Sequence, residues 1–257
     1  MNGMVWRRVH MAAAVPLVAG VIAGTLLTSC DDVQQAVDSL SSPTATPPAG
    51  ATAGATDAAP NGGGVAGDGS AMAALGTLQV QPLSTETKYK RDEFGTPWKD
   101  VDHNGCDTRN DVLHRDLRSV TVQKSDDCIV LTGELTDPYT TRIIRFSRSR
   151  DSSAVQIDHV VALADAWRTG AYAWTDDQRE AFANDPQNLL AVDGPTNIDK
   201  SDQDASEWLP PAKGYQCTYV ARQVGLKARY HLWVTQTEAD AMRAVLSTCP
   251  AQPALGQ

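Results

Sequence analysis

Three short stretches between residues 157 and 200 hold side chains that could carry out hydrolytic chemistry. They are Ile157-Asp158-His159-Val160, Asn188-Leu189-Leu190 and Asn197-Ile198-Asp199-Lys200. A carboxylate, an imidazole and two carboxamides fall at the ends of short apolar runs, which suits a hard-metal site beside a general base. The combination predicts cleavage of phosphodiester bonds.

Asp158 and His159 can take different roles because they are neighbours on one expected strand. The alternation of residues 154–158 predicts a strand, and successive side chains of a strand point to opposite faces. Asp158 can then hold a metal while His159 stays free of it. A free imidazole with the ordinary pKa of about 6.5 can deprotonate a water at neutral pH.

Asn197 adds a second oxygen ligand. Two protein oxygens, with the remaining positions left to water and phosphate, fit Mg²⁺ better than Zn²⁺, and Mn²⁺ is the alternative. The metal would stabilise charge on the leaving oxygen. Ordinary interpretations stand beside this one: Asp158 and His159 as a surface pair, and Asn197 as a helix N-cap or turn residue.

In order and spacing, these residues resemble the HNH, or ββα-metal, nuclease signature in the variant whose last His is replaced by Asn. From Tyr89 to Cys249 the chain resembles secreted bacterial HNH endonuclease-family proteins, which are similar to the C-terminal nuclease domain of GmrSD-type restriction systems. The matching segments are Phe94-Gly95-x-x-Trp98, Asn104-Gly105-Cys106-Asp107-Thr108-Arg109, Asp137-Pro138-Tyr139, Ala183-Asn184-Asp185 and Trp208-Leu209-Pro210-Pro211.

The resemblance implies an α+β fold with a ββα-metal core, a flanking antiparallel β region and additional helices. It makes His159 the general base, Asp158 and Asn197 the metal ligands, and Asn188 the residue that orients the His or its loop. Lys200 would lie one helical turn beyond Asn197, near the phosphate.

Other elements can be expected from local signals. The 28 residues between His159 and Asn188 exceed the needs of a hairpin, and they predict two helices, residues 160–169 ending at Gly170 and residues 175–183 with Thr175 as N-cap. Thr235-x-x-Glu238 predicts a capping box that opens a last helix. Further expected elements are helices 108–117 and 215–230, strands 120–123, 128–132, 140–146 and 188–192, and a helix from about Thr196.

The N-terminal part of the chain predicts export. Arg7-Arg8, an apolar run and Leu27-Thr28-Ser29-Cys30 have the form of a secretory leader ending in a lipobox, which would leave Cys30 lipidated. A secretory signal without lipidation is the alternative. We therefore expect a leader at 1–30, a disordered Ala/Gly/Pro/Thr-rich tether at 31–85, the nuclease domain at 86–250 and a tail at 251–257.

Four cysteines remain in the expected domain, and no two form a Cys-x-x-Cys pair, so a zinc knuckle has no support. An even number in an exported protein predicts two disulfides. We favour Cys106–Cys128 and Cys217–Cys249 because these pairs close the shorter loops, with the other two connectivities open.

Charge opposes nucleic-acid binding, since the formal net charge is −9 and such proteins usually present a basic surface. The exception is a group of arginines, Arg142, Arg145, Arg148 and Arg150, just before Asp158. Arg142, Arg145 and Arg109 are candidate phosphate ligands, and a solvated strand is the alternative for the group.

Asp100-x-Asp102-x-Asn104-Gly105 matches the first positions of an EF-hand calcium loop, with the shorter Asp111 at the twelfth position. The sequence thus raises a second metal site, for Ca²⁺, against an Asp/Asn-rich turn held by Cys106.

The expected function is metal-dependent endonuclease activity outside the cytoplasm. DNA is the expected partner, with RNA as the alternative; the membrane is reached through the lipid anchor, and no protein partner is implied. The absence of Gly-x-Ser-x-Gly argues against a serine hydrolase. The rival is a non-catalytic envelope lipoprotein with a decayed nuclease site that binds calcium or an envelope polymer.

Overall fold

The computed structural model describes residues 69–255. The expected leader, its Cys30 and the tether up to residue 68 lie outside these residues. In chain order the elements are α1 (Ala71–Leu75), the 3-10 helix η1 (Arg91–Phe94), α2 (Thr108–Asp116), β1 (Leu117–Gln123), β2 (Asp126–Thr136), β3 (Ile143–Ser147), β4 (Val155–His159), α3 (Leu163–Arg168), the 3-10 helix η2 (Ala171–Ala173), α4 (Asp176–Ala183), β5 (Leu189–Asp193), α5 (Gly194–Lys200), α6 (Lys213–Arg229) and α7 (Gln236–Leu246).

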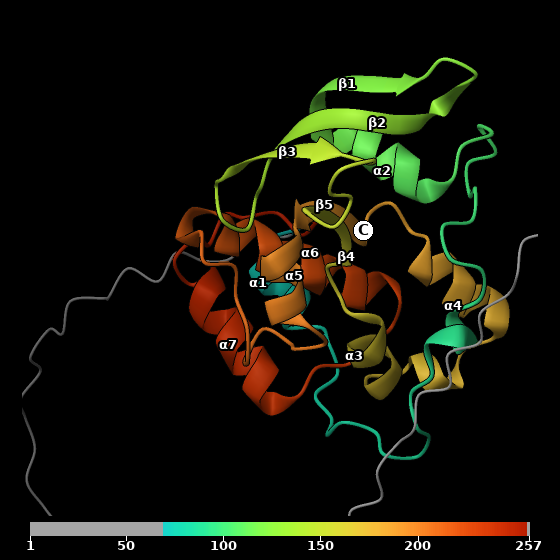
Figure 1. Cartoon of the computed structure of the whole chain (residues 1–257). Helices are drawn as coiled ribbons and strands as arrows, with labels where there is room; N and C mark the ends of the chain where they lie inside the picture. Colours follow the sequence, from blue (N-terminus) through green and yellow to red (C-terminus); the bar gives the residue numbers. More distant parts are fainter. Residues whose placement is uncertain (1–68, 256–257) are drawn as a thin grey trace, which may run out of the picture. The chain divides into compact units, whose positions relative to one another are not determined.

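The first sheet is antiparallel, with β2 between β1 and β3. Val130, Leu135 and Phe146 of this sheet are buried and form one apolar cluster with Val112 and Leu113 of α2. The sheet and α2 lie at the top of Figure 1. The expected flanking antiparallel region is confirmed, and so is the mixed α+β class.

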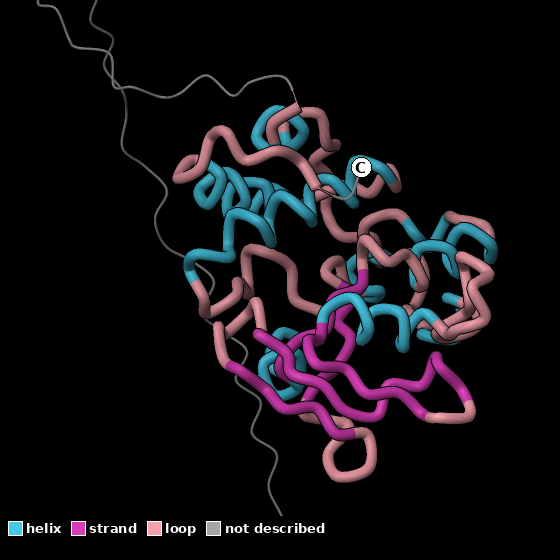
Figure 2. Tube along the Cα trace, turned by 90° about the horizontal axis from the view of Figure 1, so that it is seen from above, coloured by secondary structure: helices cyan, strands magenta, loops and turns pink. Residues whose placement is uncertain are grey.

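The second sheet consists of β4 and β5, paired antiparallel from Val155↔Asp193 to His159↔Leu189. Alternate residues of β5 enter different cores: Leu189 packs under the three-stranded sheet, whereas Leu190 packs among the helices. Both faces of β5 are therefore buried. Strands gather on one side of the described region and most of the helices on the other (Figure 2).

The chain passes directly from β5 into α5. Asp193 caps this helix, since its side chain accepts from Thr196 N at 3.0 Å. A Cβ on Gly194 would lie 2.0 Å from the Ser153 carbonyl oxygen, so only glycine permits this close start. β4, β5 and α5 thus form one strand–strand–helix unit with α3, η2 and α4 inserted between the strands.

The inserted helices follow the local signals. Thr175 and Gln178 form a reciprocal capping box at α4. The first inserted helix begins at Leu163, later than expected, because residues 160–162 continue as a loop tied to Asn188. At α7 the capping box is only half present: Thr235 accepts from Glu238 N, but the Glu238 carboxylate turns inward to Lys227.

The expected domain boundaries are wrong at both ends. Residues 69–85, assigned to the tether, include α1, whose Ala71 and Leu75 are buried against α6 and α7. The expected tail is packed as well: Ala71 N donates to Gln252 O at 2.8 Å, and Leu255 N donates to Ala221 O at 3.2 Å. Alanine-rich composition suggested disorder, but a few apolar side chains docked on existing helices suffice to order the segment.

Both expected disulfides are confirmed, Cys106–Cys128 and Cys217–Cys249. The second joins α6 to the segment after α7. Among residues 69–255, no helix has both the length and the apolar character that crossing a membrane requires.

Candidate active site

Asp158, His159 and Asn197 line one polar pocket of about 520 Å³. Asp158 and His159 are the last two residues of β4, and Asn197 lies one turn into α5. Asp158 and Asn197 are 39 residues apart in the sequence, and the strand–strand–helix unit brings them together. Arg91, Gln156 and Ser201 line the same pocket. The convergence that the spacing predicted is therefore present in the fold.

His159 is held in one tautomer. Its Nε2 lies 2.8 Å from the Ala183 carbonyl oxygen, which can only accept, so Nε2 carries the hydrogen and Nδ1 keeps a free lone pair. Burial lowers the pKa of His159 to about 4, with Arg91 and Lys200 acting in the same direction. The imidazole is therefore neutral at pH 7 and presents a proton acceptor.

Asp158 is buried and has two internal partners. Its Oδ1 accepts from Lys200 Nζ at 2.8 Å, and its Oδ2 accepts from the Tyr139 hydroxyl at 2.5 Å. Burial raises the pKa of Asp158, and the Lys200 charge and these hydrogen bonds oppose that effect. Two charge-assisted bonds thus hold the carboxylate in one orientation at the pocket.

Lys200 lies behind this carboxylate, away from the solvent. Its side chain is 0% exposed, and its Nζ also donates to the His159 carbonyl oxygen at 2.9 Å. Lys200 does not line the polar pocket. The resemblance placed it near the phosphate, whereas in this arrangement it contacts Asp158 and the backbone of His159.

Asn188 fixes the loop that follows His159. Its Oδ1 accepts from Val161 N at 2.9 Å and its Nδ2 donates to Val161 O at 3.2 Å, while Val160 N donates to the Asn188 carbonyl at 2.8 Å. The buried carboxamide therefore acts as a bridge between β5 and the exit of β4. Its contacts are those of a residue that orients the histidine loop.

The donor set fits a hard divalent cation. Each Asp158 oxygen accepts one hydrogen bond and retains a second lone pair. Asn197 Nδ2 donates to Gln156 Oε1 at 2.9 Å, so Asn197 Oδ1 is the atom of this amide left without a hydrogen bond within residues 69–255. No group of three His, Cys, Asp or Glu side chains in the described chain is placed to bind a metal, so a cation here would rely on two protein oxygens, water and phosphate.

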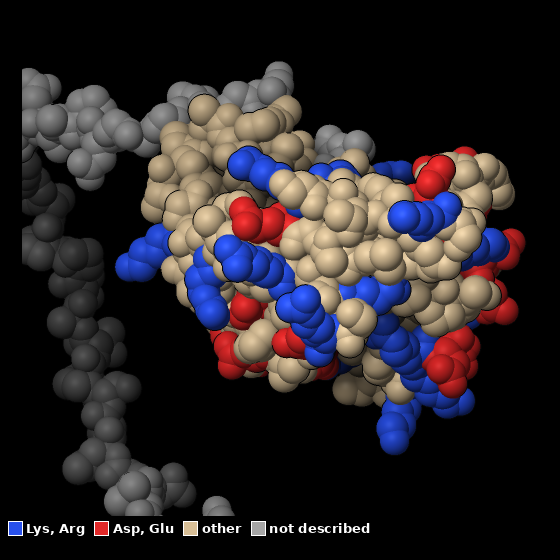
Figure 3. Space-filling view, turned by 45° about the horizontal axis from the view of Figure 1, so that its top comes forward, with Lys and Arg blue, Asp and Glu red and all other residues tan. Residues whose placement is uncertain are grey.

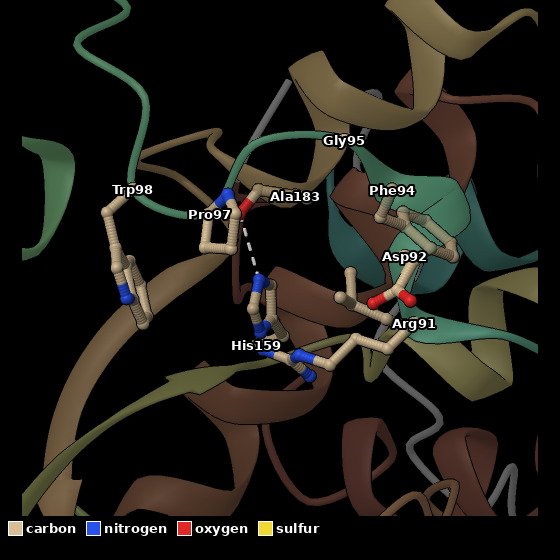
Figure 4. Close-up of a pocket in the computed structure, with 9 residues that line it drawn as sticks. Arg91, Asp92, Phe94, Gly95, Pro97, Trp98, His159 and Ala183 are labelled. Carbon is tan, nitrogen blue, oxygen red and sulfur yellow. Dashed lines mark hydrogen bonds between the residues drawn. The ribbon is translucent and has the colours of Figure 1, made fainter.

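A second, more apolar pocket of about 300 Å³ adjoins the first and shares Arg91, His159 and Leu163 with it. Figure 4 shows His159 at its centre, with Trp98 on one side and Phe94 on the other. Nothing in the sequence singled out Arg91, although it lines both pockets, because Lys90-Arg91-Asp92-Glu93 has the composition of an ordinary charged turn. Trp98 and Tyr139 were not predicted as site residues either. Both lie in segments that match the nuclease family, and that match was the signal that could have identified them.

The candidate phosphate ligands are dispersed. Arg142 lies 3.7 Å from Asp193, at the end of the β4–β5 ladder opposite to His159, and Arg145 is exposed on β3. Arg109 lies over Trp98, with its guanidinium 6.0 Å from the ring centre, and it lines neither pocket. Arg148 is used internally, since it donates to Val130 O and Asn110 Oδ1. On the face in Figure 3, basic side chains are spread out with acidic ones among them.

The Asp100–Gly105 loop is closed by its own hydrogen bonds. Asp100 accepts from Gly105 N at 3.0 Å, and Asn104 Nδ2 donates to Asp102 and to Asp111 at 3.1 Å each. These are the bonds of an Asx-type turn. The Ca²⁺ site stays a prediction.

The chain is similar to a known protein family and to a secreted protein. Residues 107–245, more than half of it, match the family described as the C-terminal domain of GmrSD restriction endonucleases. A protein of the fungus Arthroderma benhamiae, described as an uncharacterized secreted protein, is 38% identical over 181 residues, which cover 70% of this chain and 84% of that protein. No solved structure matches. The relative is fungal, so the bacterial origin that the resemblance suggested has no support here; the chain belongs to the family of GmrSD C-terminal domains.

Proposed function

We propose that this protein is a metal-dependent endonuclease of the HNH type that hydrolyses phosphodiester bonds outside the cytoplasm. The observation that carries the proposal is the His159 imidazole, neutral and fixed on the Ala183 carbonyl, in one pocket with Asp158 and Asn197. The family match supports a nuclease, since it is named for restriction endonucleases.

In this proposal His159 takes a proton from water at Nδ1. Asp158 and Asn197 would hold Mg²⁺, or Mn²⁺ in its place. When bound, the cation supplies positive charge that stabilises the developing charge on the leaving oxygen. Tyr139 and Lys200 oppose the effect of burial on the pKa of Asp158 and hold its carboxyl group in one orientation, and they are positioning residues because neither lines the polar pocket.

The β4–β5–α5 unit supports a ββα-metal core, since it has the element order and places the three signature residues at one pocket. DNA is the proposed substrate, and RNA is the alternative. Action outside the cytoplasm is supported by the two disulfides and by the relative that is described as secreted.

The decisive experiment is nicking of supercoiled plasmid by the purified protein in Mg²⁺, in Mn²⁺ and in excess chelator. We expect cleavage in either metal and none in chelator. His159→Ala should lower the rate by about 10²- to 10⁴-fold with the fold intact. His114→Ala is the matched control, because His114 is exposed on α2 outside both pockets and its loss should leave the rate unchanged.

The metal ligands are tested in the same assay by titration. Asn197→Ala should raise the Mg²⁺ concentration needed for half-maximal rate, since it removes an oxygen donor. Nicking that persists in chelator, or that survives in His159→Ala, would sink the proposal. A folded protein with no cleavage in any metal would favour the rival, a non-catalytic envelope lipoprotein.

We also propose that Cys30 carries a lipid, on the motif Leu27-Thr28-Ser29-Cys30. The native protein should then partition into detergent, and Cys30→Ser should abolish this. Recovery of the native protein wholly in the aqueous phase would remove the anchor and leave the nuclease proposal standing.

A further inference from the structure

The apolar pocket beside His159 has a rigid aromatic lining. Phe94, which lines it, is buried and packs against Tyr89, Trp167 and Phe182, with ring centres 6.1 to 6.4 Å apart. The Trp98 indole and the His159 imidazole are nearly parallel, 20° apart with ring centres separated by 6.4 Å. Flat, nearly parallel ring faces that line a pocket are suited to a flat ligand.

The Trp98 loop is fixed from both sides. Asn184 receives a hydrogen bond from Lys99 N at 3.0 Å and donates to Thr96 O at 3.1 Å, so the end of α4 fastens the loop. Trp98 itself has φ 57°, a left-handed conformation that a bulky residue seldom adopts. Strain of this kind, held by surrounding bonds, is typical of residues that a binding site requires in one place.

A positively charged side chain, that of Arg91, lies where the two pockets meet. Arg91 lines both of them, is exposed, and reaches toward His159 in Figure 4. Arg109 lies over Trp98 at 6.0 Å. A ligand that spans the pockets would place a planar group against Trp98 and a negative group beside Arg91. Nucleotides have this combination of a flat base and an adjacent phosphate.

We propose that the Trp98 pocket binds one unpaired nucleobase of the substrate strand, next to the phosphate that lies at His159. This inference rests on the proposed function and deepens it by naming the substrate as single-stranded nucleic acid. In a duplex each base is stacked and paired, and filling the pocket would require a base to be extruded at a cost. The pocket therefore favours single strands, loops and frayed ends.

The test is binding in excess chelator, where no cleavage interferes. Fluorescence anisotropy compares a labelled oligothymidylate, an abasic phosphodiester of the same length and charge, and a duplex. Stacking of one base on an aromatic side chain should make the oligothymidylate bind roughly 5- to 150-fold more tightly than the abasic chain. The duplex should bind more weakly than the oligothymidylate.

Variants then locate the preference. Trp98→Ala should bring the affinities for oligothymidylate and abasic chain together, whereas Trp98→Phe, which keeps a flat face, should retain most of the difference. Arg91→Ala should weaken both probes alike, and Arg243→Ala, at an exposed position on α7, is the charge-matched control with no effect.

The wild-type comparison of the two single strands needs no variant and so does not depend on the folding of Trp98→Ala. Equal affinity for the base-bearing and abasic chains, or tighter binding of the duplex, would overturn the inference. In that case plasmid nicking in Mg²⁺ would still support the proposed function. Absence of cleavage of both plasmid and oligothymidylate in Mg²⁺, together with a base preference lost in Trp98→Ala, would refute the catalytic proposal and keep the subsite.

Discussion

Two helices each bury a lysine against carboxylates, and the two regions treat the charge differently. Lys200 of α5 faces one carboxylate, Asp158, and its other bond goes to the His159 carbonyl. Lys227 of α6 faces two carboxylates, Asp165 at 3.0 Å and Glu238 at 2.6 Å. Both lysines are 0% exposed.

The hydrogen bonding differs as well. At Asp158 both oxygens have donors with good geometry. In the second cluster, Lys227 Nζ and both Glu238 oxygens are buried, and Nζ lies within ion-pair distance of Glu238. None of these three atoms makes a hydrogen bond of good geometry within residues 69–255. Burial raises the pKa of Glu238 to about 8, with the neighbouring Asp165 acting in the same direction.

The difference teaches how the number of carboxyl groups around one buried ammonium, and their hydrogen bonds, change the pKa of each carboxyl group. One ammonium paired with one carboxyl group, with a donor to each oxygen, opposes the rise in pKa that burial causes at Asp158 and holds its oxygens in place at the pocket. One ammonium shared by two carboxyl groups leaves Glu238 largely protonated at neutral pH, which suits a structural role joining α6 to α7.

Removing each lysine is the strongest way to break this comparison. Lys200→Met and Lys227→Met should each lower the free energy of unfolding by about 3–5 kcal/mol, because each strands a buried carboxylate. Only Lys200→Met should also lose nicking activity per folded molecule. Urea denaturation and plasmid nicking measure the two effects, and a Lys227→Met protein that loses activity equally would show that the regions are not separate.

A pH titration of stability sharpens the contrast. The pKa of Glu238 is about 8 when folded and 4.5 ordinarily, so the folded state binds more protons between these values and stability falls as pH rises through that window. Glu238→Gln, which resembles the neutral acid, should gain stability over the wild type as pH rises, by about 4 kcal/mol at pH 8.

The corresponding substitution beside Lys200 is Asp158→Asn, which neutralises the carboxyl group that Lys200 contacts. It should abolish nicking because the charge for the cation is lost, whereas Glu238→Gln should keep full activity. The free energies of unfolding of the wild type and Glu238→Gln can be compared from pH 4.5 to 8. If their difference does not change with pH, Glu238 is ionised in the folded protein.

The smallest effect is expected from two tyrosine hydroxyls. Tyr139→Phe removes the donor to Asp158 and should cost about 1–2 kcal/mol of stability. It should also lower activity roughly 10- to 100-fold, as for other residues that orient a metal ligand. Tyr219→Phe, whose hydroxyl accepts from Gln223, is the control and should leave activity unchanged. Equal activity of both variants would remove Tyr139 from the positioning role.

Local signals predicted much of the fold. Strand alternation found β4, Thr175 and Thr235 marked the starts of α4 and α7, and Gly170 marked the end of the first inserted helix. These features depend on backbone hydrogen bonds and side chains a few residues apart, which a sequence displays directly. The shorter loops also identified both disulfide pairs.

Contacts between distant segments could not be predicted in this way. The folded region begins before residue 85 because α1 docks on α6 and α7, and composition does not show such docking. Likewise, Glu238 reads as half of a capping box, although its carboxylate is buried beside Lys227. When a side chain has two possible partners, the tertiary packing decides which of them it contacts.

The sequence by itself determined which residues meet at the candidate site: Asp158, His159 and Asn197 follow from order, spacing and element type. The tertiary structure alone decided their chemistry. The tautomer of His159 depends on the Ala183 carbonyl, and the pKa and orientation of Asp158 depend on burial, on Lys200, 42 residues away, and on Tyr139. Protonation is governed by burial and by nearby charges in space, and neither can be read from positions along the chain.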